Sequence, residues 1–177
     1  ASGLMSITGP GQDDGPVKVG APVTDITAGI LAAMGAAAAY AGKQKTGLGT
    51  RVDTSLFEAG ITHTYWQSAI ALATGESPQA LGSAHPLNAP YQAFPTADGY
   101  INIGAANQRN WLRLLDVIGA TELNNDPRFS SNADRMANLD ALVEVLDGYF
   151  RQHASEVWLE KLDYAGVPAG PILSITE

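Results

Sequence analysis

The sequence predicts an α/β protein made of two units, and three observations lead to this prediction. Hydrophobic residues recur with helical spacing in some blocks and with strand-like alternation in others. The segment 81–89 is rich in Pro, Gly and small polar residues, as a linker is. The charge also shifts, since residues 1–90 carry a net charge of −2 and residues 91–177 one of −6. We therefore expect one unit over 1–80 and a second over 90–170.

In the first unit, an apolar helix is predicted over 24–40, where hydrophobic residues fall at helical spacing among Ala and Gly. The uncharged stretch 26–42 approaches the length of a membrane span, but Ala and Gly contribute little transfer free energy. We therefore expect a helix buried on all sides in a larger α/β layer, and no membrane partner. The Gly- and Pro-rich start of the chain resembles the tail of a preceding part, so we expect an N-terminal portion to be missing.

The remainder of the first unit is predicted to contain a turn, a strand and a helix. Residues 43–50 have turn composition, residues 51–57 alternate as a strand does, and residues 59–73 return to helical spacing. This helix-strand-helix order predicts one wall of an α/β sheet.

The second unit is predicted to be a hairpin followed by helices. Two alternating runs, 90–96 and 100–104, flank Asp98-Gly99, a pair that suits a tight turn. Helices are expected over 107–118, 139–153 and 155–164. The hydrophobic stripes of the first two should form the core, and they consist of Trp111, Leu114, Leu115 and Ile118, and of Leu142, Val145, Leu146, Tyr149 and Phe150.

The composition excludes several kinds of function. A net charge of −8 is the wrong sign for a nucleic-acid partner. The absence of Cys excludes thiol nucleophiles and thiolate metal sites and permits the cytoplasmic location that we expect. The three histidines lack metal-ligand spacing, so we expect no metal, with His63 a partly buried helix residue, His85 in the linker and His153 near a helix end.

Asp25 is the acidic residue that stands apart. It precedes an almost uncharged helix, and a carboxylate in such a segment needs partners because an isolated buried charge is costly. One interpretation is structural, with the carboxylate capping the first turn of the helix. The other is functional, since a helix N-terminus beside small residues can hold a carboxylate ionised next to a ligand, ready to act as a nucleophile. The two roles are compatible.

Six segments in succession resemble the family III CoA-transferases, the group of formyl-CoA transferase, carnitine CoA-transferase and α-methylacyl-CoA racemase. The match runs in order along nearly the whole chain. The segments are ASGLMSITG (1–9), VGAPVTDITAG (19–29), KTGLGTRVDTSL (45–56), PYQAFPTADGY (90–100), DPRF (126–129) and GVPAGP (166–171).

The resemblance implies an acyl-CoA transferase in which Asp25 is the catalytic nucleophile. In the family, this aspartate attacks an acyl-CoA thioester to give a mixed anhydride, and CoA then converts it to an aspartyl-CoA thioester. Leu56 is implied as a CoA-binding residue. Coenzyme A and acyl-CoA would be substrates, together with a carboxylic acid, and no covalently bound cofactor is expected.

The resemblance also implies an architecture. Residues 1–80 would be part of a large Rossmann-like domain that carries the catalytic Asp, and residues 90–170 would be the small α+β domain. Residues 171–177 would begin the segment that returns to the large domain. The family forms interlocked homodimers, so a homodimer is expected, and the chain would be a central-to-C-terminal fragment.

Two departures bear on the substrate. Residues 82–89 differ from the Gly-rich loop of formyl-CoA transferase, which places oxalate or formate in doubt. Thr24 precedes Asp25 where the racemase branch usually has Gly, and this favours transfer. Two alternatives stay open: an acyl-CoA racemase or epimerase in which Asp25 shuttles a proton, and a truncated non-catalytic remnant.

Overall fold

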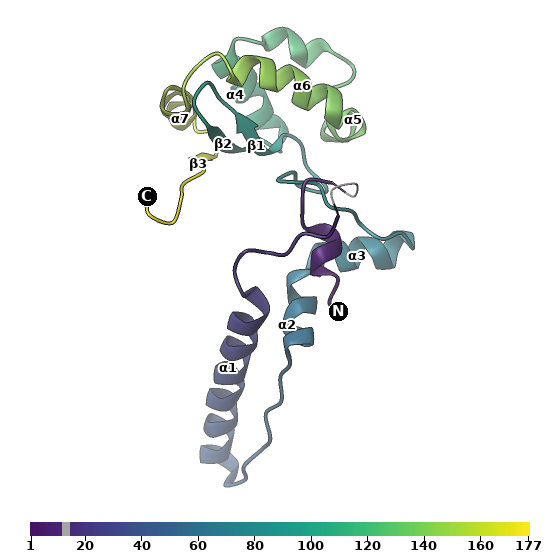
Figure 1. Ribbon diagram of the computed structural model, residues 1–177, viewed down its shortest axis with the longest axis vertical. Coiled ribbons are helices and arrows are strands. Elements are labelled where there is room, and N and C mark those ends of the chain that lie inside the picture. Colours follow the sequence, from purple (N-terminus) through teal and green to yellow (C-terminus); the bar gives the residue numbers. More distant parts are fainter. Residues whose placement is uncertain (12–14) are drawn as a thin grey trace. The chain divides into compact units, whose positions relative to one another are not determined.

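The structure is a computed structural model that describes residues 1–11 and 15–177. They form two compact units, Ala1–Gly82 and Ser83–Glu177. The division falls within the segment 81–89. Among the described residues, helices combine with a small sheet, in agreement with the predicted α/β class (Figure 1).

The described part of the first unit is helical. It contains a short 3-10 helix η1 (Leu4–Ile7), the long helix α1 (Val23–Thr46), and the shorter helices α2 (Leu56–His63) and α3 (Tyr65–Thr74). Helix α1 continues beyond the predicted end at residue 40, because Lys43 and Lys45 suit the last turn of a helix. It ends at Gly47, whose φ of 74° is the left-handed conformation that glycine adopts without strain.

The predicted strand over 51–57 is wrong. Residues 50–55 have no strand partner among the described residues, and α2 already begins at Leu56. Ser55 caps this helix, since its hydroxyl accepts a hydrogen bond from the Glu58 backbone N–H at 3.2 Å. The predicted helix over 59–73 is also interrupted, because Thr64 separates α2 from α3 and donates its hydroxyl to the Ile61 carbonyl at 3.0 Å. Where we expected a helix-strand-helix order, the described residues therefore form three helices, α1, α2 and α3, and no strand.

Helices α1 and α2 pack side by side (Figure 1), and the segment that leads into α2 also lies against α1. A Cβ on Gly35 would lie 2.5 Å from Cγ1 of Val52, which is too close for a methyl group. The Thr27 hydroxyl and Nε2 of His63 form a hydrogen bond of 2.7 Å between the two helices.

The expectation that α1 is buried on all sides is wrong for this chain. No described residue of α1 is buried, and Ile30 and Met34 are 54% and 64% exposed. By length and composition alone, α1 is also the one helix among the described residues that could cross a membrane. Its charged residues lie only in its first and last turns, at Asp25, Lys43 and Lys45.

The second unit contains a three-stranded antiparallel sheet in the order β1-β2-β3. Strands β1 (Tyr91–Pro95) and β2 (Tyr100–Gly104) form the predicted hairpin, and β3 (Ala169–Pro171), which was not predicted, pairs with β2. The helices are α4 (Gln108–Ile118), α5 (Asn132–Ala137), α6 (Leu139–Phe150) and α7 (Ser155–Tyr164), with a 3-10 helix η2 (Thr121–Asn125). Helix α6 ends three residues before the predicted boundary, and α5 is an additional element.

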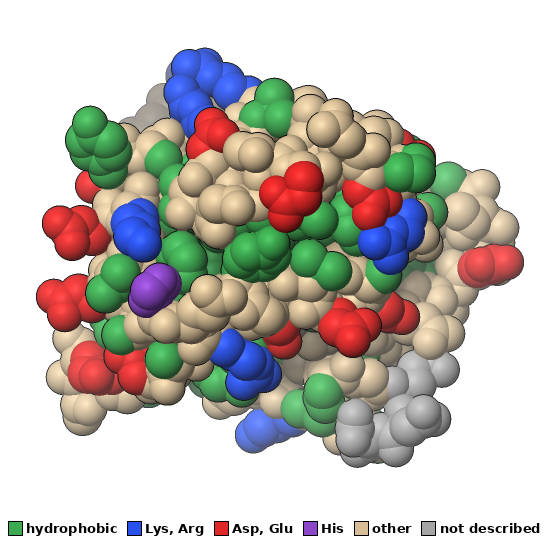
Figure 2. Space-filling view, turned by 90° about the horizontal axis from the view of Figure 1, so that it is seen from above, with side chains coloured by type: hydrophobic (Ala, Val, Ile, Leu, Met, Phe, Trp, Pro, Cys, Tyr) green, Lys and Arg blue, Asp and Glu red, His purple; other side chains and the backbone are tan. Residues whose placement is uncertain are grey.

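The core of the second unit matches the predicted stripes in large part. The four α4 residues are buried, as are Leu142, Leu146 and Phe150 of α6, while Val145 and Tyr149 are half-buried. Arg135 is fully buried and donates from Nε to the Ala89 carbonyl at 2.7 Å and from Nη1 to the Phe129 carbonyl at 3.0 Å. Burial lowers the pKa of this guanidinium. On the face shown in Figure 2, the acidic side chains are spread out rather than gathered in one patch.

Candidate active site

Asp25 is the third residue of α1, within the first turn of the helix. Its side chain is exposed, and the Thr24 hydroxyl donates to Oδ2 at 3.3 Å. The predicted position at a helix start is confirmed, but no backbone N–H of the described residues donates to this carboxylate, so it makes no capping hydrogen bond. Asp25 thus has acceptor capacity available for a ligand.

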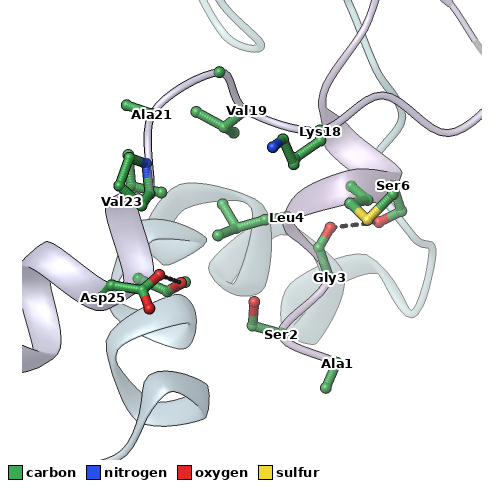
Figure 3. Close-up of a pocket in the computed structure, with 14 residues that line it drawn as sticks. Ala1, Ser2, Gly3, Leu4, Ser6, Lys18, Val19, Ala21, Val23 and Asp25 are labelled. Atoms are coloured by element: carbon green, nitrogen blue, oxygen red, sulfur yellow. Dashed lines mark hydrogen bonds between the residues drawn. The ribbon is translucent and has the colours of Figure 1, made fainter.

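The carboxylate of Asp25 lies at a pocket of about 500 Å³ (Figure 3). Two stretches of chain form it: residues 1–6, which include most of η1, and residues 18–25, which end in the first turn of α1. Helix α2 supports the first stretch from outside, because Gly60 packs so tightly against Ser2 that a Cβ at Gly60 would overlap the serine side chain. Segments far apart in sequence therefore fix the position of the pocket wall.

The pocket combines an apolar lining with few polar groups. Apolar side chains come from Leu4, Met5, Val19 and Val23, and hydroxyl groups from Ser2, Ser6 and Thr24. Lys18 and Asp25 are the two charged side chains among its lining residues. A largely apolar concavity with a few polar groups is typical of a site for a small molecule. An accessible carboxylate at its edge can act as a nucleophile or as a base.

Leu56 is not brought to this pocket. It is the first residue of α2, is 53% exposed and is not among the residues that line the pocket. Its assignment as a CoA-binding residue stays a prediction.

The three histidines lie outside the pocket lining. His63 is exposed rather than partly buried, although its ring bonds to Thr27 as described above. His85 stacks on Tyr91 at 5.1 Å, and partial burial lowers its pKa. His153 follows α6 and packs edge-on against Trp158. Within the part of the chain that the structure describes, no three His, Cys, Asp or Glu side chains gather as a metal site would require.

Sequence reasoning missed Lys18 and the serines of residues 1–6 as parts of the site. A signal for Lys18 was present, since it is the one basic residue among residues 1–42 and it lies in a loop seven residues before Asp25. The serines carry no comparable signal, because serine is common in loops of every function.

The first unit thus carries a pocket with an exposed carboxylate at the start of an Ala- and Gly-rich helix, and a small α+β unit follows it. The sequence profile of CoA-transferase family III matches residues 1–177, and the chain belongs to this family. A solved CAIB/BAIF family protein from Brucella suis superposes with a TM-score of 0.80 at 35% identity, covering 99% of this chain and 46% of that one.

Two curated relatives show the same extent of similarity. The acetyl-CoA:oxalate CoA-transferase of Acetobacter aceti is 38% identical over 179 residues, covering 99% of this chain and 45% of the relative. The succinyl-CoA:glutarate CoA-transferase of Mus musculus is 33% identical over 176 residues, covering 99% of this chain and 40% of the relative. The chain therefore spans less than half the length of these relatives.

Proposed function

We propose that the protein is an acyl-CoA transferase that moves CoA from an acyl-CoA thioester to a carboxylic acid. The observation that carries the proposal is the exposed carboxylate of Asp25 at the edge of the pocket. Membership of CoA-transferase family III supports it, as do the names of the relatives from Acetobacter aceti and Mus musculus. By analogy with the relative from Mus musculus, we place dicarboxylic acids such as glutarate among the substrates, while residues 82–89 still argue against oxalate.

The proposed reaction begins with attack by an Asp25 carboxylate oxygen on the thioester carbonyl carbon. The C–S bond breaks, CoA leaves as a thiolate, and a mixed anhydride forms between Asp25 and the acyl group. The thiolate then attacks the Asp25 carbonyl carbon, which releases the donor acid and leaves an aspartyl-CoA thioester. The first step needs the carboxylate anion of Asp25, because the protonated acid is a poor nucleophile.

The second half of the reaction repeats these steps with the acceptor acid. Its carboxylate attacks the aspartyl thioester, displaces the CoA thiolate and forms a new anhydride with Asp25. The thiolate attacks the acyl carbon of the acceptor, which gives the new acyl-CoA and frees the Asp25 carboxylate. No proton is gained or lost overall, so this scheme asks for no separate general base.

An acyl-CoA racemase or epimerase is the second candidate, with Asp25 moving a proton at the carbon next to the carbonyl. We prefer transfer because Thr24, and not Gly, precedes Asp25 and donates a hydrogen bond to it. A non-catalytic remnant is the third candidate, and it predicts neither activity.

We further propose a homodimer and a cytoplasmic location. The dimer is supported by the exposed apolar side chains of α1, which a second copy would cover. The location is supported by the absence of Cys from the sequence, which requires no oxidising compartment.

The test is a matched pair of substitutions, Asp25→Asn and Asp53→Asn. The protein is incubated with acyl-CoAs and carboxylic acids, and CoA exchange is followed by mass spectrometry. Asp25→Asn should lower turnover by several orders of magnitude, because the amide is not a nucleophilic anion. Asp53→Asn should leave turnover unchanged, since Asp53 is exposed, pairs with Arg51 and does not line the pocket.

Hydroxylamine adds a direct readout, because it converts an acyl or thioester derivative of Asp25 to a hydroxamate that a peptide map locates. Full activity in Asp25→Asn would refute the proposal. Exchange of the α-hydrogen for deuterium without CoA transfer would instead support the racemase.

A further inference from the structure

We propose that Lys18 binds a second carboxylate of the substrate and thereby selects dicarboxylic acids and their CoA monothioesters. This inference rests on the proposed transferase function of Asp25. The Lys18 side of the pocket would bind the end of the substrate that does not react, and the Asp25 side would bind the reacting end.

The position of Lys18 is the first argument. Lys18 and Asp25 both line the pocket, and in Figure 3 they lie on opposite sides of it with Leu4 between them. They are not an ion pair with each other. A substrate held at both ends would therefore have its reacting carbonyl at Asp25 and its other end at Lys18.

The second argument is that the Lys18 ammonium has no partner among the described residues. Lys18 is exposed and makes no hydrogen bond or ion pair with any residue that the structure describes. Because it is a compact charge with three donors on a flexible chain, it can reach a carboxylate without a fixed partner geometry. Charge-assisted hydrogen bonds of this kind are stronger than neutral ones.

The charge balance of the pocket is the third argument. The second carboxylate of a dicarboxylic acid takes no part in the reaction but enters the same pocket as Asp25. Asp25 is itself an anion in the proposed mechanism, so the two carboxylates repel each other. Lys18 is the one cationic side chain among the lining residues and offsets this repulsion. The apolar side chains of Leu4 and Val19 can contact the methylene groups between the two ends of the substrate.

The test compares Lys18→Met, which keeps most of the length and loses the charge, with Lys18→Arg, which keeps the charge. Lys45→Met is the matched control, since Lys45 lies in the last turn of α1, away from the pocket lining. Acceptors are glutarate and its monocarboxylate counterpart valerate. Donors are succinyl-CoA and acetyl-CoA, so that the two sources of a second carboxylate are distinguished.

With acetyl-CoA as donor, Lys18→Met should raise the KM for glutarate about tenfold, the effect of losing one charged hydrogen bond. The KM for valerate and the kcat should stay unchanged, and Lys18→Arg should restore the KM for glutarate. If instead only the KM for succinyl-CoA rises, the second carboxylate recognised is that of the donor. The inference would be overturned if Lys18→Met had the same KM as the parent protein for glutarate and also the same KM as the parent protein for succinyl-CoA.

A binding measurement separates this inference from the proposed function. Amide chemical shifts of pocket residues are followed during titration with glutarate and, separately, with CoA. Binding of glutarate that is lost in Lys18→Met supports the inference even in a protein without transfer activity, in which case only the proposed function fails. Absence of glutarate binding, or a loss of CoA binding alone, would overturn the inference, the latter because Lys18 would then contact a phosphate.

Discussion

The two units bury their hydrophobic residues very differently. In the first unit, Ala59 and Ala80 are the buried hydrophobic residues among those the structure describes. The second unit buries seventeen, among them Trp111, Phe129 and Phe150, in one continuous cluster. In the first unit, many large apolar side chains on α1, α2 and α3, such as Met34, Phe57 and Leu72, are instead half or more exposed.

The proposed chemistry and the hydrophobic core therefore lie in different units. The pocket with Asp25 belongs to a unit in which Gly35 and Gly60 make close contacts and no large hydrophobic side chain among the described residues is buried. A unit of this kind gains little free energy from its own apolar burial and depends on another surface to cover it. The second unit has a continuous hydrophobic core of its own, which an independently folding domain needs.

The largest expected effect comes from separating the units. Expressed alone, residues 83–177 should fold and unfold cooperatively on heating, because the core cluster lies entirely within them. Residues 1–82 alone should show helical far-ultraviolet circular dichroism without a cooperative transition. A sharp transition in 1–82 would mean that the first unit has a sufficient core of its own.

Assembly should give the next largest effect. We expect light scattering at micromolar concentration to show a homodimer, with residues 1–80 providing most of the contact, because monomers rarely leave so large an apolar area exposed. Met34→Glu on α1 should weaken it, and Leu112→Glu on α4, a substitution at an exposed leucine of the second unit, should not. A stable monomer of the parent chain would contradict the view that another copy covers α1.

The sequence predicted the second unit more accurately than the first. In the second unit, the hydrophobic stripe 111–118 correctly predicted α4, since hydrophobic spacing is a reliable signal where one face of a helix is buried. The Asp98-Gly99 turn correctly predicted the hairpin of β1 and β2. The helix predicted over 139–153 was right as far as Phe150, where α6 ends. Strand β3 escaped prediction because its three residues are too few to show a period.

In the first unit the same reasoning failed where tertiary context decided. Residues 51–57 alternate, but alternation predicts a strand only when a neighbouring strand is present, and Ser55 starts a helix instead. The position of Asp25 in a first helical turn was predictable from the apolar run that follows it. Its pocket was not, because residues 1–6 and 18–25 come together only in the folded chain.

A core substitution should affect the two units unequally. Phe150 is fully buried and packs on Phe94 and Trp158, so Phe150→Ala should lower the free energy of unfolding by about 3–5 kcal/mol. Phe57 on α2 is 52% exposed, and Phe57→Ala should cost less than about 1 kcal/mol. Denaturant unfolding of each variant measures both values. A comparable loss at Phe57 would show that this ring is buried in solution.

The smallest effect is expected at the hydrogen bonds that join the hairpin turn to α7. Asp98 accepts from the Ser155 backbone N–H at 2.8 Å, from the Ser155 hydroxyl at 2.9 Å and from the Thr96 hydroxyl at 3.0 Å. These bonds, first of all that from the Ser155 backbone, hold the pKa of Asp98 below its ordinary value of 3.8.

Because the folded state lowers this pKa, Asp98 stabilises the second unit at pH values above 3.8, and the contribution is lost as the pH falls from 3.8 through the lower pKa of the folded state. Asp98→Asn should therefore be less stable than the parent chain near neutral pH, and the difference should shrink as the pH falls below 4. Thermal unfolding across pH measures it. Asp163→Asn on α7 is the control, since its carboxylate makes no hydrogen bond with a described residue, and its difference from the parent should not follow this profile. A constant difference for Asp98→Asn at all pH values would mean that the hydrogen bonds matter for their geometry and not for the charge they stabilise.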